Sequence, residues 1–477
     1  MSTRRFVRNS LLLICIEMLA KALGVVFFAL VARFLGAREL GLLAFATAVA
    51  NFIVLPARFG FETVVQRDVG RHPAGTLVYF QGIGLLKGLI SLGVIVIYVA
   101  ALKIAGRGEV TVMVLVACFT LVYSFMEFIN AFFRANQRPE LELAVRSFFS
   151  VSNLLLGVLV LYAGWRLTGV VSSQLLSVGL AVLLGTWILL RIAPAVRTHR
   201  DRQNLTKYLA AAAPFAGILV ALFFSNQIGV IILTPWAGSE EVGYFAAAAR
   251  LFDALTLIPA AVMGAFLPLM SQLYVQTLSG FVRTLNFTIR YLFILTAPLV
   301  VVTIILAPKI IAFLYRQAFA PSVPALQILS GALIFSFWNC ASESVLVARN
   351  RERPLLKLAW ITAGIHVAAN LLLIPWFSYL GACWAVLATQ GLYSLILFRT
   401  LLRRYLSLAS LCRLLALPAL SAALMSAALI PIRDYSLLMS IPAGLLVYVG
   451  ALLALGVLSR EEMHRLQGMV TVGVRNP

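Results

Sequence analysis

The chain has 477 residues, of which 62% are hydrophobic and only 12% charged, and its mean hydropathy is +0.99. Soluble domains are about one quarter charged and about half apolar, so this composition excludes an ordinary soluble fold and an intrinsically disordered chain. The formal net charge of +21 would favour nucleic-acid binding in a soluble protein, and it has to be located along the chain before it is interpreted.

Apolar runs interrupted by charges or by glycine and proline predict fourteen transmembrane helices, since one span needs about 20 apolar residues. In chain order they cover residues 11–32, 41–60, 76–102, 110–133, 143–164, 167–190, 208–234, 243–270, 287–307, 323–348, 356–376, 379–398, 411–431 and 436–458. The connections between them are short, so the sequence predicts no sizeable soluble domain.

The positions of Lys and Arg test this count independently, because basic residues collect on the cytoplasmic side of a membrane. With the amino terminus placed inside, the cytoplasmic segments hold 27 of the 38 basic residues and the outer loops hold 8. The other three, Lys21, Lys87 and Arg250, lie within spans. The alternation predicts that both termini are cytoplasmic, and nucleic-acid binding loses support because the cations are spread over separate loops.

Three pairs of motifs indicate an internal duplication. The pattern G-x-x-E-[L/V]-G occurs at 36–41 and again at 238–243, which is 202 residues later. Asn-Gln-Arg-Pro at 136–139 matches the segment 350–354, and Asn-Leu-Leu-Leu at 153–156 matches 370–373. The copies are six spans apart, so the repeats are parallel, and parallel repeats place a substrate site between the two halves.

The motifs also resemble a known family. They are Ala32-Arg33-Phe34-Leu35-Gly36, Glu241-Val242-Gly243-Tyr244, Pro324-Ala325-Leu326-Gln327-Ile328-Leu329, Asn370 to Pro375, and Leu380-Gly381-Ala382. Together with the fourteen-span layout they resemble the polysaccharide or O-antigen flippases of the multidrug/oligosaccharidyl-lipid/polysaccharide exporter (MOP) superfamily. Where many members carry an Asp in helix 7, this chain has Asn226-Gln227, which puts any role of that carboxylate in doubt.

The resemblance implies an all-α, MATE-like polytopic membrane protein with two parallel six-helix bundles. We expect the bundles at 1–207 and 208–405, followed by two extra helices and a cytoplasmic tail at 406–477. It further implies a flippase in the cytoplasmic membrane that moves polyprenyl-pyrophosphate-linked oligosaccharides to the outer leaflet by alternating access. Polysaccharide polymerases or glycosyltransferases would be its protein partners.

Ionisable residues inside spans are functional candidates, because a charge there has to face protein or water. Eight stand out in the predicted helices: Glu17, Lys21, Lys87, Glu127, Arg250, Asp253, Glu343 and His366. Glu17 with Lys21 and Arg250 with Asp253 share a helix face, so each pair either neutralises itself in packing or lines a hydrated cavity. Lys87 has no partner nearby in the sequence and either faces the cavity or extends to an interface.

A pyrophosphate cannot enter hydrocarbon without cationic partners. We therefore predict that Lys21, Lys87 and Arg250 contact or attract the phosphate, with Glu17 and Asp253 belonging to the same substrate site. Arg33, Arg58, Arg134 and Arg290 are secondary candidates, each either a phosphate partner or an interface anchor. Glu127 is either a partner for a cation or an interfacial group, and Glu343 and His366 either relay protons or pack with hydrogen bonds.

Two other functions compete with this interpretation. A membrane enzyme would need carboxylates or metal ligands gathered in a water-facing loop, and the sequence predicts neither that nor a metal or cofactor site. A drug or organic-cation exporter of the same fold is the closer alternative, because fold alone does not fix function. Four acids against three bases within the spans favour an anionic substrate only modestly.

Overall fold

The computed structural model describes residues 3–104, 109–193, 205–348 and 353–457, and every regular element in these ranges is a helix. The elements are α1 (Thr3–Ile53), α2 (Leu55–Arg58), α3 (Phe61–Arg71), η1 (Pro73–Gly75), α4 (Thr76–Ile104), α5 (Val110–Ala135), α6 (Pro139–Tyr162), α7 (Leu167–Ile192), α8 (Leu205–Asn226), α9 (Ile228–Leu255), α10 (Leu257–Gln276), α11 (Leu278–Ile305), α12 (Ala307–Tyr315), η2 (Gln317–Phe319), α13 (Ser322–Ala348), α14 (Arg353–Thr400), η3 (Leu402–Arg404), α15 (Leu408–Ile432) and α16 (Leu437–Ala454).

The predicted spans can be compared with these helices. Within the described ranges, ten helices are long and apolar enough to cross a membrane, and a bent pair, Ala22–Ile53 with Leu55–Arg71, is an eleventh candidate. Three of the eleven change direction internally, at Gly36, Gly238 and Ser378, whose φ angles are 82°, 77° and 51°. Each change falls where the sequence predicts a turn between two spans, so dividing there gives fourteen segments, a number compatible with the prediction.

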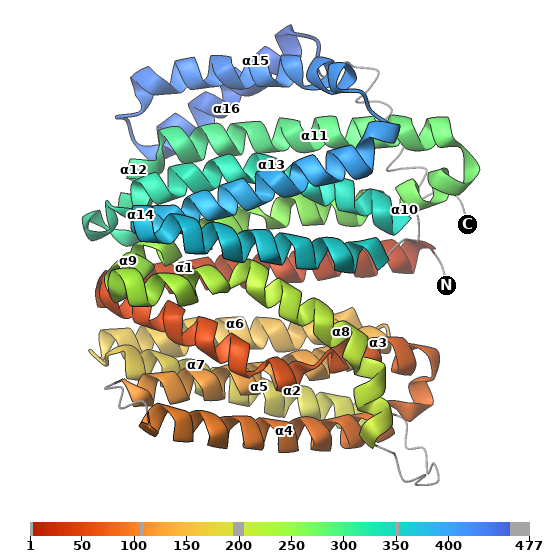
Figure 1. Cartoon of the computed structure of the whole chain (residues 1–477), viewed down its shortest axis with the longest axis vertical. Helices are drawn as coiled ribbons and strands as arrows, with labels where there is room; N and C mark the ends of the chain where they lie inside the picture. The colour runs from red at the N-terminus through yellow and green to blue at the C-terminus, as the bar shows by residue number, and fades with distance from the viewer. Residues whose placement is uncertain (1–2, 105–108, 194–204, 349–352, 458–477) are drawn as a thin grey trace. The chain divides into compact units, whose positions relative to one another are not determined.

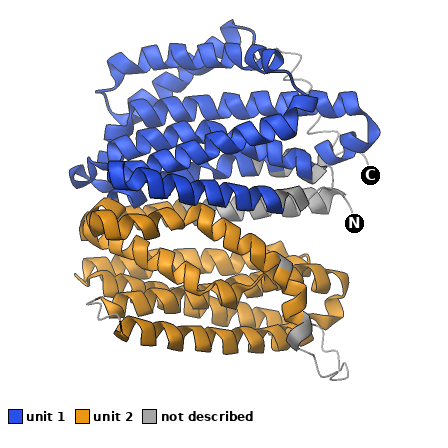
Figure 2. Cartoon of the chain, in the orientation of Figure 1, with its two compact units in different colours: residues 1–10, 244–477 blue, residues 11–243 orange. Residues whose placement is uncertain are grey.

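The chain forms two compact units, shown in Figure 2. Unit 2 comprises residues 11–243, and its core surrounds α5, which packs against α3, α4, α6 and α7. Phe128 and Phe132 of α5 are buried in this core with Val65 of α3 and Val178 of α7. Figure 1 shows α4 to α7 side by side in this unit. Helix α5 has apolar side chains on several sides, and these pack against the helices that surround it.

Unit 1 comprises residues 1–10 and 244–477, and its main core lies between α11, α13 and α14. The two last described helices, α15 and α16, pack on α11 through a separate small core that includes Met425. The Tyr448 hydroxyl of α16 donates to the Ile294 carbonyl of α11 at 2.9 Å. At the helix ends, Arg290 donates to the carbonyl of Val457, and Lys309 donates to a carbonyl in the turn after α15. These contacts fix α15 and α16 against the rest of unit 1.

The duplicated glycine motifs meet each other inside unit 2. A β-carbon added to Gly41 would lie 1.6 Å from the Ser239 carbonyl oxygen, and one added to Gly243 would lie 2.0 Å from that of Ala37. Gly41 corresponds to Gly243 in the repeat, and Ala37 corresponds to Ser239. The two contacts are therefore reciprocal, as they are across a two-fold axis. Only glycine allows the two helix starts to approach this closely.

The boundary between the two compact units lies at a different residue from the repeat boundaries that the sequence predicts. Helix α8, near whose start the sequence predicts the second repeat to begin, packs on α2, α3 and α4 of unit 2. The units separate after Gly243, whereas the sequence predicts a boundary between 207 and 208 and another between 405 and 406. The compact units are defined by contacts between helices, whereas the repeats are defined by similar sequence motifs. The repeat boundaries therefore stay predictions.

Candidate functional site

Lys87 on α4 is fully buried, with 0% of its side chain exposed against 16% for Glu62. Its ammonium donates to the Ala57 carbonyl at 2.9 Å and to Glu62 Oε1 at 3.3 Å. The ring centroids of Phe125 and Phe128 on α5 lie 5.5 and 5.8 Å from Nζ, within range of cation–π attraction. These partners account for a charge inside the span in this conformation, and the contact of Lys87 with a phosphate stays a prediction.

The partners of Lys87 belong to a break in the second predicted span. Between α2 and α3 the chain turns through Phe59 and Gly60, whose φ angles are 39° and 80°. The last carbonyls of a helix have no intrahelical partner, and Lys87 supplies a donor to Ala57 at the end of α2. Glu62 lies in the first turn of α3, where negative charge is favoured. One lysine therefore bridges the end of one helix and the start of the next.

A second group of charges joins α5 and α6. Arg134 Nη1 donates to Glu142 Oε1 at 2.8 Å, and Arg146 Nε lies 2.9 Å from the same oxygen. Arg146 Nη2 donates to Glu127 Oε2 at 2.7 Å. Glu142 is nearly inaccessible, with 2% of its side chain exposed. Glu127 therefore has a cationic partner, which is one of the two roles that the sequence left open for it.

This α5–α6 charge cluster, made of Glu127, Arg134, Glu142 and Arg146, contains buried atoms that form no hydrogen bond with any described residue. Among them are Oε1 of Glu127, Oε2 of Glu142 and Nε of Arg134. Buried polar atoms usually have a partner, so each such atom is a place where another group can bind or where the side chains can rearrange. The secondary candidate Arg134 is engaged by Glu142 in this conformation.

Sequence reasoning missed Glu62, Glu142 and Arg146 as members of these groups. Glu62 and Glu142 lie just outside the ends predicted for spans 2 and 5, where charges are expected at a membrane surface. The i, i+4 spacing of Glu142 and Arg146 was the available signal. The pairing of Glu62 with Lys87, 25 residues away, has no local signal.

The other residues that the sequence predicts for the substrate site lie on α1, α2 and α9. Arg33 and Arg58 are half-buried, Arg250 is half-buried, and Asp253 is exposed. Glu17 and Lys21 lie in α1, but their side chains are outside the described part of the structure. The substrate-binding role predicted for these residues stays a prediction.

Three predicted residues of unit 1 have partners within that unit. Arg290 bonds to a carbonyl after α16, as described above. The Tyr393 hydroxyl of α14 donates to Glu343 Oε1 on α13 at 2.7 Å. Nδ1 of His366 lies 3.2 Å from the Thr389 hydroxyl oxygen, both on α14. Glu343 and His366 therefore sit in hydrogen-bonded packing, and a proton relay through them stays a hypothesis.

The repeated Asn-Leu-Leu-Leu motif places one asparagine at equivalent positions in the two halves. Asn153 on α6 and Asn370 on α14 are both buried, and the side-chain oxygen of each has no hydrogen-bond partner among the described residues. The Asn370 amide donates to the His366 carbonyl at 2.8 Å. The two positions that the predicted duplication relates therefore both hold a buried polar group, followed by the same apolar residues.

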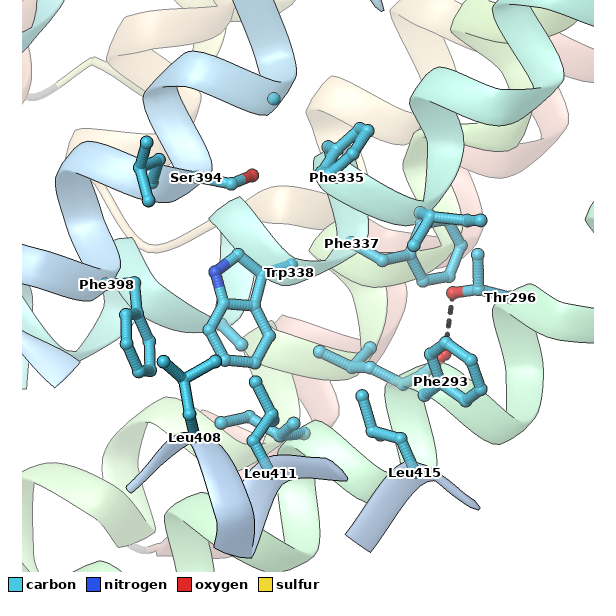
Figure 3. A pocket seen from close by; sticks show the side chains of 16 residues that line it. Phe293, Thr296, Phe335, Phe337, Trp338, Ser394, Phe398, Leu408, Leu411 and Leu415 are labelled. Carbon is cyan, nitrogen blue, oxygen red and sulfur yellow. Dashed lines mark hydrogen bonds between the residues drawn. The ribbon is translucent and has the colours of Figure 1, made fainter. Parts of the chain in front are cut away.

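Unit 1 contains an apolar pocket of about 420 Å³ between α11, α13, α14 and α15. Figure 3 shows Trp338, Phe398 and Leu411 among the side chains around it. The two hydroxyl groups at its wall are already bonded, Thr296 to a carbonyl of its own helix at 2.6 Å and Ser394 to a side-chain oxygen of α13 at 2.7 Å. The pocket thus offers mostly apolar surface, which suits a hydrocarbon chain.

The comparisons with known proteins agree with this architecture. Residues 6–274 match the model of a family described as "Polysaccharide biosynthesis protein". An uncharacterized membrane protein of Methanocaldococcus jannaschii is 24% identical over 241 residues, which is 48% of this chain and 46% of that protein. The chain thus spans about half the length of the curated relative it matches.

Solved structures resemble the fold over most of the chain. The lipid II flippase MurJ in an inward closed conformation has a TM-score of 0.68 at 14% identity, covering 92% of this chain and 98% of MurJ. A multidrug resistance MATE family transporter of the MOP superfamily, in an inward-facing conformation, has a TM-score of 0.62 at 15% identity, covering 83% and 98%. The all-α, MATE-like fold predicted from the sequence is therefore confirmed.

Proposed function

Since the chain belongs to the polysaccharide biosynthesis protein family, we propose that it is a flippase for polyprenyl-pyrophosphate-linked oligosaccharide. It would move this lipid from the inner to the outer leaflet of the cytoplasmic membrane by alternating access. The described helices are long and apolar enough for a multi-pass membrane protein, and their fold is the one that a flippase and a transporter share. The family match carries the proposal, because it connects polysaccharide biosynthesis with a chain of that fold.

The apolar pocket of unit 1 supports a lipid-linked substrate. Its volume of about 420 Å³ lies in the range of ordinary ligand pockets, about 300–1,000 Å³, and its wall is almost entirely hydrocarbon. A segment of a polyprenyl chain fits this chemistry, because burial of apolar surface is favourable and needs no polar partner. We assign the pocket to part of the lipid tail.

The head group needs the opposite chemistry. Lys21, Lys87 and Arg250 are proposed to attract the pyrophosphate, with Glu17 and Asp253 as nearby acids of the site. Charge-assisted hydrogen bonds from such cations replace the hydration that the phosphates lose. Lys87 would have to leave its present partners, Ala57 and Glu62, to take this role.

A drug or organic-cation exporter is the second candidate function, because MATE family transporters have the same fold. The two functions differ in the sign of the charge that the protein has to stabilise. An anionic lipid requires cations in its path, whereas an organic cation requires uncompensated acids. The substrate class can therefore be decided by a direct transport measurement.

The test is reconstitution of the purified protein in liposomes with a fluorescent polyprenyl-pyrophosphate oligosaccharide. We expect the labelled head group to become accessible to an impermeant quencher on the opposite leaflet, at a rate proportional to the protein content. Neutral variants at Lys21 and Arg250 should lose most of this activity while inserting normally. Transport of a hydrophobic cation in its place would overturn the proposal in favour of the exporter.

Filling the pocket tests the assignment of the lipid tail. Leu411→Trp places a larger side chain in the pocket wall, so we expect slower flipping of a long polyprenyl substrate and a smaller effect on an analogue with a short chain. Leu420→Trp is the control, because Leu420 lies on the same helix but outside the pocket and is exposed. Equal effects of the two variants on the long substrate would contradict the assignment.

Two further features of the cellular role are proposed with the function. Both termini would lie in the cytoplasm, as the distribution of Lys and Arg predicts. Polysaccharide polymerases or glycosyltransferases would act on the same lipid before or after it crosses the membrane. Co-purification of such an enzyme with the intact chain is the measurement that addresses the second point.

A further inference from the structure

One edge of the apolar pocket in unit 1 is formed where α14 ends and α15 begins. Phe398, in the last turn of α14, and Leu408, at the start of α15, both line the pocket (Figure 3). Residues 399–407, which include η3, connect these two side chains. This short connection therefore borders the pocket.

Apolar side chains hold the connection on the core. Leu402 and Leu406 are buried, and both belong to the main core of unit 1. The ring of Tyr405 packs on that of Phe281 of α11, with their centroids 5.4 Å apart. The backbone amides of Tyr405 and Leu406 both donate to the Leu402 carbonyl at 2.8 Å. A connection that is fixed in this way presents its polar side chains from a defined position.

Three arginines of this connection, Arg399, Arg403 and Arg404, are exposed and are called the arginine rim below. No Asp or Glu occurs between residues 353 and 433, so neither of the two helices that the rim joins carries an acid. Among the described residues of the helices that line the pocket, the one acid is Glu343 on α13, and the Tyr393 hydroxyl already donates to it. The arginine rim is therefore cationic.

A cationic rim beside an apolar pocket matches a ligand that has phosphate at the end of a hydrocarbon chain. Guanidinium groups bind phosphate oxygens through paired, charge-assisted hydrogen bonds, and the pocket of about 420 Å³ favours burial of apolar surface. A polyprenyl pyrophosphate lipid has one chain and two adjacent phosphates, whereas an ordinary phospholipid has two chains and one phosphate. One pocket beside three arginines therefore favours the polyprenyl lipid.

We propose that the arginine rim and the pocket together form an entry site for the lipid-linked substrate, separate from Lys21 and Arg250. The rim binds the pyrophosphate while the pocket holds the first part of the chain, on the side that the distribution of Lys and Arg predicts to be cytoplasmic. The head group then moves to the cations predicted inside the spans. This inference rests on the proposed function and adds a binding step before transport.

The first test measures the dissociation constant of polyprenyl pyrophosphate for the full chain in phosphatidylcholine nanodiscs. Arg403→Gln combined with Arg404→Gln should raise it on the order of tenfold or more, because charge-assisted hydrogen bonds to phosphate are lost. Binding of polyprenol, which has no phosphate, should not change in this rim variant. Leu411→Trp should weaken the binding of both lipids, since Leu411 lines the pocket.

Arg413→Gln is the matched control for the single variant Arg404→Gln. Arg413 is also exposed and lies on α15, but it follows Leu411 by two residues and is therefore on the opposite side of the helix from the pocket. Both variants remove one positive charge from the same end of unit 1. Arg404→Gln should weaken the binding of polyprenyl pyrophosphate, whereas Arg413→Gln should leave it unchanged.

The second test uses the flipping assay in liposomes. The rim variant should raise the substrate concentration that gives half the maximal rate and leave the maximal rate nearly unchanged, because the rim acts before transport. Neutral variants at Lys21 and Arg250 should lower the maximal rate. This difference separates the entry site from the proposed head-group site.

The inference is overturned if the rim variant binds polyprenyl pyrophosphate as tightly as Arg413→Gln does. It is also overturned if phosphatidylglycerol competes equally well, which would make the rim a site for ordinary anionic lipid. Where the glutamine variant fails to fold, Arg403→Lys with Arg404→Lys keeps the charge and should give a smaller loss in the same direction.

The two proposals fail in different ways. Rim-dependent binding in a protein that moves no lipid-linked oligosaccharide would refute the flippase proposal alone. Flipping whose dependence on substrate concentration is the same with and without the rim arginines would refute the entry site alone.

Discussion

Buried charges in unit 2 are stabilised by residues from neighbouring helices. Lys87 has a carbonyl, a carboxylate and two aromatic rings around it, and Glu142 has two guanidinium groups on one oxygen. Burying a charge is costly unless it is paired. At the scale of single residues, removing one partner of a buried charge should therefore lower the stability of the protein strongly. Removing one partner of an exposed ion pair should lower it little.

Glu142 gives the sharpest case. Glu142→Ala would leave the guanidinium groups of Arg134 and Arg146 without their shared acceptor, so we expect the free energy of unfolding to fall by about 3–5 kcal/mol. Asp68→Ala removes a partly exposed pair with Arg67 and should cost no more than about 1 kcal/mol. Unfolding in detergent, followed by circular dichroism, compares the two. Similar losses for both variants would mean that burial does not control the strength of these pairs.

The close contact of the repeated glycines makes a second prediction. Gly41→Ala and Gly243→Ala should each lower the free energy of unfolding by about 1–3 kcal/mol or more, because the added carbon meets a backbone oxygen that has to move. Gly88→Ala is the matched control, since no described atom lies within 4 Å of its added carbon. A helical alanine there should be neutral or stabilising. Thermal unfolding of the three variants in detergent measures the differences.

At the scale of helices, hydrophobicity and positive charge predicted most of the architecture. The spans are long apolar runs, and the predicted turns coincide with the backbone changes at Gly36, Gly238 and Ser378. The break at Phe59 and Gly60 was not predictable, because it depends on packing. A β-carbon at Gly60 would lie 2.5 Å from the β-carbon of Phe215, on a helix about 155 residues later in the chain.

The candidate site was less predictable than the fold. Sequence reasoning singled out Lys87 as an unusual charge, but its partner Glu62 is on another helix and leaves no signal in the local spacing of the sequence. The same holds for the meeting of Arg134 with Glu142 across the turn between α5 and α6. Charge pairs along one helix can be predicted from the i, i+3 or i, i+4 spacing of the residues in the sequence. Pairs between helices depend on how each helix is rotated about its axis and how far it is shifted along its neighbour.

The packing of α16 on α11 depends in part on one hydrogen bond, and its contribution can be tested. Tyr448→Phe removes the hydroxyl that donates to the buried Ile294 carbonyl, so we expect a loss of about 1 kcal/mol and easier proteolysis of the α15–α16 hairpin. Tyr435→Phe changes an exposed side chain of the same hairpin and should have no effect. Limited proteolysis in detergent, read by mass spectrometry, measures this difference. Equal cleavage rates would show that the Tyr448 hydroxyl does not hold the hairpin.

For the whole molecule, the distribution of basic residues predicts a definite orientation in the membrane. A cysteine at Gln137, in the exposed turn after α5, should react with an impermeant maleimide only from the cytoplasmic side. A cysteine at Arg166, in the turn between α6 and α7, should react only from outside. Intact and inverted vesicles of a chain without native cysteines distinguish the two. Labelling of both positions from one side would contradict the fourteen-span topology.

The meeting of the two glycine motifs has a consequence for any attempt to divide the chain. A fragment ending after α7 contains Ala37 and Gly41, while their counterparts Ser239 and Gly243 belong to the fragment that begins at α8. Neither fragment can complete unit 2 by itself. When the two fragments are co-expressed, they should therefore bind each other and fold together. An alanine at either glycine should prevent this binding, even where the uninterrupted chain with the same alanine still folds.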